Sequence, residues 1–132
     1  MISVLITSDP RYPINKDRIR EQIEKSLAEM RVSSDVEISV TVVGDRKMKE
    51  LNKTFRQVED TTDVLSFPLE ENSEESGFVK FPDNLLRLGD IVISYPQAIM
   101  NAHEFNRMVD DEINLLIEHS VMHLLGYHHE GD

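Results

Sequence analysis

The 132-residue sequence contains no cysteine and no tryptophan, and it has only five glycines and five prolines. Without cysteine there is no disulfide framework and no thiolate site, so a bound metal must take nitrogen or oxygen ligands. No apolar run approaches the roughly 18 residues that can cross a membrane. The N-terminal apolar stretch is too short for a secretory signal and lacks flanking basic residues. These absences predict a cytoplasmic protein with no membrane partner.

Positive charge is also scarce, with 14 Lys and Arg against 25 Asp and Glu, which gives a net charge of −11. This balance opposes nonspecific binding to nucleic acid, because phosphate binding needs cations. Residues 45–56 nevertheless carry five cations against two acids, whereas residues 59–75 carry seven acids and no base. A local cationic patch of this kind can hold a phosphate. An ordinary solvated helix face explains its lysines equally well.

Histidines are concentrated at the end of the chain, where four of the five fall within the last sixteen residues. Three of them have the spacing His119-x3-His123-x5-His129. Two histidines four residues apart on a helix share one face, with Cβ atoms about 6 Å apart. That separation suits two imidazoles that converge on one ion at roughly 2.0–2.1 Å. His103 has no partner at ligand spacing, and we interpret it as a solvated helix residue.

The segment around these histidines is typical of a buried helix over residues 111–125, with Asp110 or Asp111 as its N-cap. We therefore expect His119 and His123 inside the core or at its edge. Gly126 stands where helices commonly end in the left-handed conformation, and a chain reversal there would present His129 to the same ion. Three protein nitrogens leave a fourth position for water, which is the catalytic pattern of zinc sites.

The usual zinc-peptidase motif has a Glu directly after its first histidine as the general base. Here that position is Ser120, and Glu118 lies about 100° away around the helix. The site therefore resembles a zinc hydrolase site without its normal base, which weakens a peptidase assignment. The three-histidine pattern favours one zinc ion, although imidazole ligands also suit nickel, copper and iron.

This segment resembles the signature His-Gly-x-Leu-His-Leu-x-Gly-Tyr-Asp-His of the YbeY family of bacterial rRNA-maturation endoribonucleases. Two departures are that Ser120 replaces the usual Gly and His128 replaces the usual Asp, which removes a carboxylate beside the site. Further blocks resemble the family in the same order: Asn-Lys-Thr-Phe-Arg at 52–56, Thr-Asp-Val-Leu-Ser-Phe-Pro at 62–68, and Leu-Gly-Asp-Ile-Val-Ile-Ser at 88–94.

The resemblance implies a metal-dependent endoribonuclease that cleaves single-stranded RNA. Its implied task is rRNA processing, especially maturation of the small-subunit 3′ end, together with ribosome quality control. The implied partners are rRNA, the small ribosomal subunit and assembly factors. The matching positions imply His119, His123 and His129 as the zinc ligands and Arg56 as the catalytic residue that binds the phosphate.

From the sequence alone, Arg56 is equally well explained as a cation that faces the dipole at a helix end. Asp63 also has two interpretations, since it could orient a ligand histidine or Arg56, or simply start a strand. We interpret Ser66 as structural.

Alternation and capping signals predict four strands and four helices in a single domain over residues 1–132. The strands are expected at 2–7, 36–43, 63–67 and 89–94, and the helices at 15–31, 45–55, 94–107 and 111–125. Asn15, Asp45 and Ser94 are the predicted N-caps of the first three helices, and residues 70–87 are predicted to form a loop or irregular hairpin arm.

Because crossovers are right-handed, the first strands should pair in parallel, while the third and fourth can pair antiparallel. We expect an α+β fold with a small, mixed, mainly parallel sheet, and the resemblance implies a zinc-peptidase-like architecture.

Two other functions remain compatible with these residues. The first is a metal-dependent hydrolase that acts on another substrate such as peptides. The second is a non-catalytic ribosome assembly factor whose metal is structural, in which case a fourth protein ligand, such as His128, would close the site.

Overall fold

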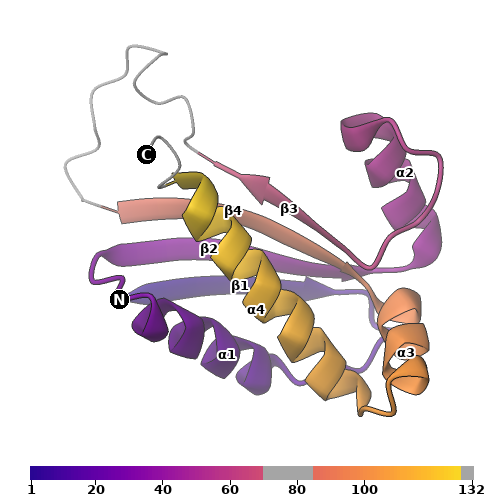
Figure 1. The fold of residues 1–132 in the computed structure, drawn as a ribbon, viewed down its shortest axis with the longest axis horizontal. Coiled ribbons are helices and arrows are strands. Elements are labelled where there is room, and N and C mark those ends of the chain that lie inside the picture. The colour runs from indigo at the N-terminus through magenta and orange to yellow at the C-terminus, as the bar shows by residue number, and fades with distance from the viewer. Residues whose placement is uncertain (70–84, 129–132) are drawn as a thin grey trace.

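The computed structural model describes residues 1–69 and 85–128, of which 127 and 128 are described by their backbone alone (Figure 1). The elements in chain order are β1 (Ile2–Ser8), α1 (Lys16–Glu29), β2 (Asp35–Val43), α2 (Asp45–Arg56), β3 (Val64–Pro68), β4 (Leu85–Ser94), α3 (Tyr95–Glu104) and α4 (Val109–His128). The four strands form one sheet in the order β1-β2-β4-β3. β1 and β4 each pair in parallel with β2, and β3 pairs antiparallel with β4. The predicted α+β fold with a mixed, mainly parallel sheet is confirmed.

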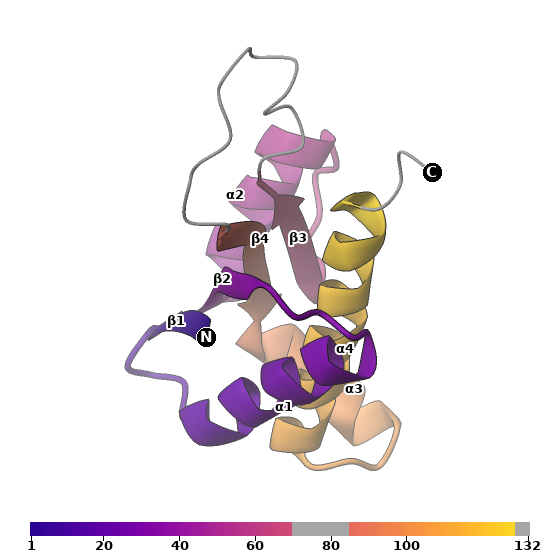
Figure 2. The same cartoon turned by 90° about the vertical axis from the view of Figure 1, so that its left-hand side faces the viewer.

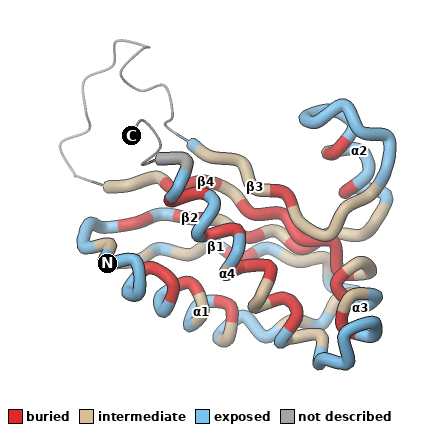
Figure 3. Tube along the Cα trace, viewed as in Figure 1, coloured by how far each residue is buried: buried red, intermediate tan, exposed pale blue. Residues whose placement is uncertain are grey.

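Helices cover both faces of this sheet. α1 and α4 lie on one face and α2 lies on the other (Figure 2). Side chains alternate along each strand, so Ile91 and Ile93 of β4 enter the core under α1 and α4, whereas Val92 faces α2. In Figure 3 the buried residues of α1 and α4 lie toward the strands. The sheet therefore separates two packing layers of unequal size.

Two of the three predicted N-caps are confirmed. The side chain of Asn15 accepts a hydrogen bond from the Arg18 backbone N–H at 3.1 Å, and Ser94 Oγ accepts one from the Gln97 N–H at 3.3 Å. The prediction for α2 is wrong, because Gly44 is its N-cap and makes no side-chain cap hydrogen bond. Asp45 is instead the first helical residue of α2, and its carboxylate binds side chains from other elements.

The predicted end of the histidine helix is also wrong. α4 continues through Gly126 to His128, and the positive-φ glycine of the described residues is Gly89. Glycine inside a helix costs about 1 kcal/mol relative to alanine, which is less than the gain from burying a leucine. Leu124 and Leu125, directly before Gly126, are fully buried, so packing carries the helix onward. The expected chain reversal therefore does not occur at Gly126, and His129 lies outside the described residues.

Two further boundaries differ from the prediction. α4 begins at Val109, so Asp110 and Asp111 lie in its first turn and do not precede it as caps. β4 begins at Leu85, so residues 85–87, predicted as part of a loop, belong to a strand that pairs with β2. Pairing with a central strand satisfies their backbone groups, a tertiary effect that the local sequence does not reveal.

Gly89 of β4 has a φ of 145° and pairs with Pro68 of β3. A Cβ atom at this position would lie 2.3 Å from the carbonyl oxygen of Phe67. Only glycine tolerates both this φ and this contact. Gly89 therefore fixes how the edge strand β3 lies against the sheet.

Candidate functional site

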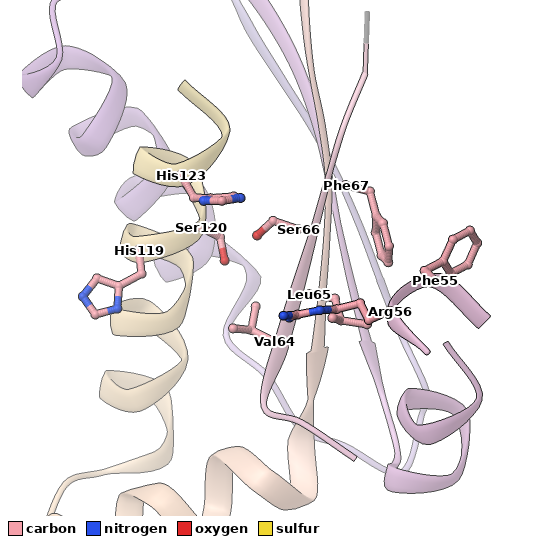
Figure 4. A pocket seen from close by; sticks show the side chains of 9 residues that line it. All are labelled: Phe55, Arg56, Val64, Leu65, Ser66, Phe67, His119, Ser120 and His123. Atoms are coloured by element: carbon pink, nitrogen blue, oxygen red, sulfur yellow. The ribbon is translucent and has the colours of Figure 1, made fainter. Parts of the chain in front are cut away.

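A cavity of about 510 Å³ lies beside β3, an edge strand, and is bounded by the C-terminal turns of α2 and α4 (Figure 4). The described residues that line it are Phe55, Arg56, Val64, Leu65, Ser66, Phe67, His119, Ser120 and His123. The structure thus brings together Arg56, His119 and His123, which the sequence analysis selected from segments more than sixty residues apart.

The α4 wall of the cavity carries the two histidines. Both side chains are exposed. Of the two predicted positions, inside the core or at its edge, the structure therefore shows the edge. Figure 4 shows the His123 ring directed toward β3 and the His119 ring turned away from it. Neither imidazole makes a hydrogen bond or ion pair with residues 1–69 or 85–128. Two unengaged imidazoles one helical turn apart fit the donor set of a transition metal. Rotation of the His119 side chain between staggered rotamers is the change that a shared ion requires.

No carboxylate lines the described part of the cavity. The buried Ser120 faces it from α4 and Ser66 faces it from β3 (Figure 4). Glu118 is absent from the lining, in agreement with its predicted position around the helix. The described residues therefore offer imidazole, hydroxyl and guanidinium groups and lack the carboxylate base of a zinc peptidase.

Arg56 forms the opposite wall as the last residue of α2. In Figure 4 its side chain extends toward β3, and its guanidinium points toward Val64. The side chain is exposed and forms no ion pair with any described residue, so it is free to bind an anion. The helix ends here because Gln57 adopts the left-handed conformation and its N–H bonds the carbonyl of Lys53.

The other cations of α2 share the exposure of Arg56. Lys49 and Lys53 precede Arg56 by seven and three residues, so the three side chains follow one face of the helix. All three are exposed and form no ion pairs within the described ranges. This face, the cationic row of α2, leads along the helix to the cavity.

Asp63 takes a structural part in this arrangement. Its carboxylate accepts a hydrogen bond from Asn101 Nδ2 at 3.1 Å, and its carbonyl accepts one from the Ser94 N–H at 2.9 Å. Asn101 also bonds Glu112 at 3.4 Å, and Arg107 donates to that buried carboxylate at 2.7 Å. These bonds tie the start of β3 to α3 and α4. Asp63 contacts neither Arg56 nor a histidine through any hydrogen bond within the described residues.

Asp45 forms a second polar junction and is not the predicted N-cap. Its carboxylate accepts hydrogen bonds from Thr61 Oγ1 at 3.0 Å, Ser94 Oγ at 2.8 Å and Gln97 Nε2 at 3.2 Å. One carboxylate at the first turn of α2 thereby holds that helix to the segment before β3 and to the start of α3. No local pattern identifies it, because all three donors come from distant segments.

The aromatic part of the cavity lining, formed by Phe55 and Phe67, was not predicted from the sequence. Phe55 is 59% exposed, and its ring meets that of Phe67 edge to face, with centroids 5.1 Å apart. The available signal was an aromatic residue directly before Arg56 in the last turn of an amphipathic helix. His103, in contrast, is exposed near the end of α3, as predicted.

Comparisons with known proteins point to one family. The family model for endoribonuclease YbeY matches residues 6–132. Endoribonuclease YbeY of Moorella thermoacetica is 37% identical over 122 residues, which cover 90% of this chain and 78% of that protein. The Aquifex aeolicus protein of the same name is 40% identical over 117 residues, or 89% and 71% of the two chains. The solution structure of TM1509 from Thermotoga maritima superimposes with a TM-score of 0.59 at 26% identity, covering 94% of this chain and 73% of that one.

The family match spans almost the whole chain and includes every residue that lines the cavity. More than a third of the aligned residues are identical in each relative, over about nine tenths of this chain. The chain therefore belongs to the endoribonuclease YbeY family.

Proposed function

We propose that this endoribonuclease family member uses one bound zinc ion to cleave single-stranded RNA. Its proposed task is rRNA maturation, especially at the small-subunit 3′ end, and ribosome quality control, with the small subunit and assembly factors as partners. The observation that carries the proposal is the meeting of His119, His123 and Arg56 in one solvent-open cavity. The family name supports RNA as the substrate.

The metal would be held by His119 and His123 together with His129. The first two fit because their rings are exposed, four residues apart on one helix and unengaged by any described residue. When bound, zinc supplies a Lewis acid and a water that ionises near neutral pH. Ile117, Val121 and Leu124 are fully buried, so the helix that presents the two rings is rigidly placed.

Arg56 would bind the phosphate next to the bond that is cleaved. A guanidinium donates two parallel hydrogen bonds to phosphate oxygens and offsets the charge that develops on them. Its cavity position and the absence of an ion-pair partner among residues 1–69 and 85–128 support this role. Lys49 and Lys53 would hold neighbouring phosphates of the same strand along the cationic row of α2.

Cleavage assays on purified, untagged protein test the proposal. The protein is stripped with a chelator, reloaded separately with zinc, nickel, copper or iron, and incubated with single-stranded RNA, duplex RNA and a peptide library. We expect zinc to restore cleavage of the single strand alone. Peptide cleavage without RNA cleavage would overturn the proposal. Metal analysis of the native protein before stripping identifies the resident ion.

A peptide substrate is the second candidate, because β3 is an edge strand of the sheet and lies beside the histidines. Extended peptides bind such edges by adding a strand. The absence of a carboxylate from the described lining opposes it, since zinc peptidases use one as the general base. The peptide arm of the same assay decides between the two.

A further inference from the structure

The aromatic side of the cavity has no part in metal or phosphate binding. We propose that Phe55 is a stacking platform for one unpaired base of the substrate strand, with Phe67 as its support. This inference rests on the proposed function, because it assigns a contact to the same RNA. It concerns how the strand is recognised rather than how it is cleaved.

The exposure of Phe55 is the first step of the argument. α2 is held to the sheet by Met48, which is fully buried against Leu65 and Val92, with Leu51 packed at the edge of that cluster. Phe55, one turn after Leu51, remains 59% exposed. Single exposed apolar residues are common on protein surfaces. This one differs because it lines the cavity that also contains Arg56 and the two histidines.

The support from Phe67 is the second step. Phe67 belongs to β3 and packs against the Met48 cluster, so its position is fixed by the sheet. The edge-to-face contact with Phe55, at 63° between the ring planes, holds the Phe55 ring from one side. Figure 4 shows the two rings beside each other at the end of α2, while the Arg56 guanidinium points away from them toward Val64. The remaining surface of Phe55 is a preorganised aromatic contact.

Charge selects the occupant of this platform. Arg56, Lys53 and Lys49 form the cationic row of α2, and none of them is neutralised by a described residue. Aromatic side chains next to a cationic track are the two elements by which proteins bind single-stranded nucleic acid. Phe55 and Arg56 are consecutive in α2, so their side chains diverge by about 100° around the helix. One RNA strand that passes the end of α2 can therefore place a base on the ring and a phosphate at the guanidinium.

The platform would also discriminate between single and double strands. A base inside a duplex is already paired and stacked on its neighbours, so its face is not available without an unstacking cost. A strand with unpaired bases pays little of that cost. Phe55 would therefore contribute a preference for single-stranded RNA that the phosphate contacts alone cannot provide.

Tryptophan fluorescence tests this contact directly, because the chain contains no tryptophan. Phe55→Trp places a single reporter on the platform. The matched control is Phe105→Trp. Phe105 is 56% exposed, and its ring centroid lies 5.0 Å from Arg107 Cζ, but it is outside the cavity lining. Both variants are titrated, with a chelator present, with a single-stranded oligouridylate, an abasic strand of equal length and an RNA duplex. We expect the oligouridylate to quench Phe55→Trp and to leave Phe105→Trp unchanged.

Kinetics provide an independent readout. Phe55→Leu keeps an apolar side chain but removes the aromatic face, so it should raise KM for single-stranded RNA about tenfold, with a smaller change in kcat. Phe55→Trp should restore the wild-type KM. The urea midpoint of each variant is measured to confirm folding, and the Phe105→Leu control should keep the wild-type KM.

The outcomes separate the two proposals. If wild-type protein cleaves single-stranded RNA but Phe55→Leu keeps its KM and Phe55→Trp is unquenched, the platform is wrong and the proposed function stands. Equal quenching by the abasic strand also overturns the platform, since the ring would then sense only the phosphates. If metal-loaded wild-type protein neither binds nor cleaves single-stranded RNA, both proposals fail.

Discussion

The two helical walls of the cavity are anchored in different ways. α4, which carries the histidines, contributes six buried residues to a core cluster of nineteen described residues: Ile113, Leu116, Ile117, Val121, Leu124 and Leu125. α2, which carries Arg56 and Phe55, contributes only Met48 to a buried cluster of three. The wall with the histidines therefore belongs to the main core, whereas the wall with Arg56 is attached to the outer face of the sheet.

Polar contacts compensate for the small apolar contact of α2. Asp45 receives three side-chain donors at the first turn of the helix, and Asn52 Nδ2 bonds the carbonyl of Asp60 at 2.8 Å near the last turns. Hydrogen bonds are directional whereas apolar burial is not, so few contacts suffice to orient the helix. The difference implies that stability and phosphate binding can be changed separately in this molecule.

The largest expected effect is at the α4 wall. His123→Ala should reduce bound metal to background and RNase activity below detection, because one of the proposed ligands is lost. The metal-free protein should unfold at an unchanged urea concentration, since the side chain is exposed. Elemental analysis and a cleavage assay measure the result, with His103→Ala, an exposed histidine of α3, as the control. Retention of stoichiometric metal by His123→Ala would contradict the ligand assignment.

The next prediction concerns the α2 wall. Arg56→Ala should keep its metal but lose about 10²- to 10³-fold in kcat/KM, as expected for a donor that stabilises transition-state charge. Lys25→Ala, an exposed cation of α1, is the control for the loss of one positive charge. Full activity of Arg56→Ala would show that the phosphate role is wrong. Loss of metal in this variant would show that the two walls are not separable.

Matched core truncations test the anchoring itself. Ile117→Ala and Met48→Ala each remove a fully buried side chain, and such changes cost about 2–5 kcal/mol. We expect Ile117→Ala near the upper end, at about 4 kcal/mol, and Met48→Ala near the lower end, at about 2 kcal/mol, because α2 can relax outward. Urea unfolding gives both values. A larger loss for Met48→Ala would refute the proposed difference between the walls.

A smaller effect is expected at the polar junction of α2. Asp45→Ala removes the acceptor of three side chains, among them the fully buried Ser94, and should cost about 1–3 kcal/mol for the groups left unsatisfied. Because Asp45 orients α2, kcat/KM should also fall. Thr61→Val removes one of these donors only and should have the weaker effect on both quantities. Unchanged kcat/KM in Asp45→Ala would mean that α2 keeps its position without this junction.

The smallest expected effect is the change in stability at Gly126, where the sign of the change distinguishes a helix from a left-handed turn. Gly126→Ala should stabilise the protein by about 0.5–1 kcal/mol, because alanine is the better helix former. An added Cβ meets no atom within 4 Å there, so packing does not oppose it. The urea midpoint measures the change. Destabilisation would instead support a left-handed turn at Gly126, as the sequence suggested.

Local chemistry explains which elements could be predicted from the sequence. Asn15 and Ser94 each bond an amide three residues ahead, so their capping signals are complete within one turn. The predictions for Gly126 and Asp45 were wrong because tertiary contacts decide the roles of both residues. Burial of the neighbouring leucines continues the helix through Gly126, and donors from distant segments bind Asp45.

The candidate site divides along the same line. Spacing identified His119 and His123, and family resemblance identified Arg56, but no short-range pattern brings α2 to the histidines. Phe55 escaped notice because its exposure and its contact with Phe67 exist only in the folded chain.

Gly89 has a consequence for the chemistry of both walls. A strand that slips by one residue turns every side chain to the opposite face. Such a slip of β3 would direct Ser66 into the apolar layer beneath α2 and swing Phe67 toward His123. The glycine prevents this by admitting the Phe67 carbonyl at a point where any side chain would collide. A missing methyl group on the neighbouring strand thus keeps the α2-facing and the α4-facing side chains of β3 from exchanging places.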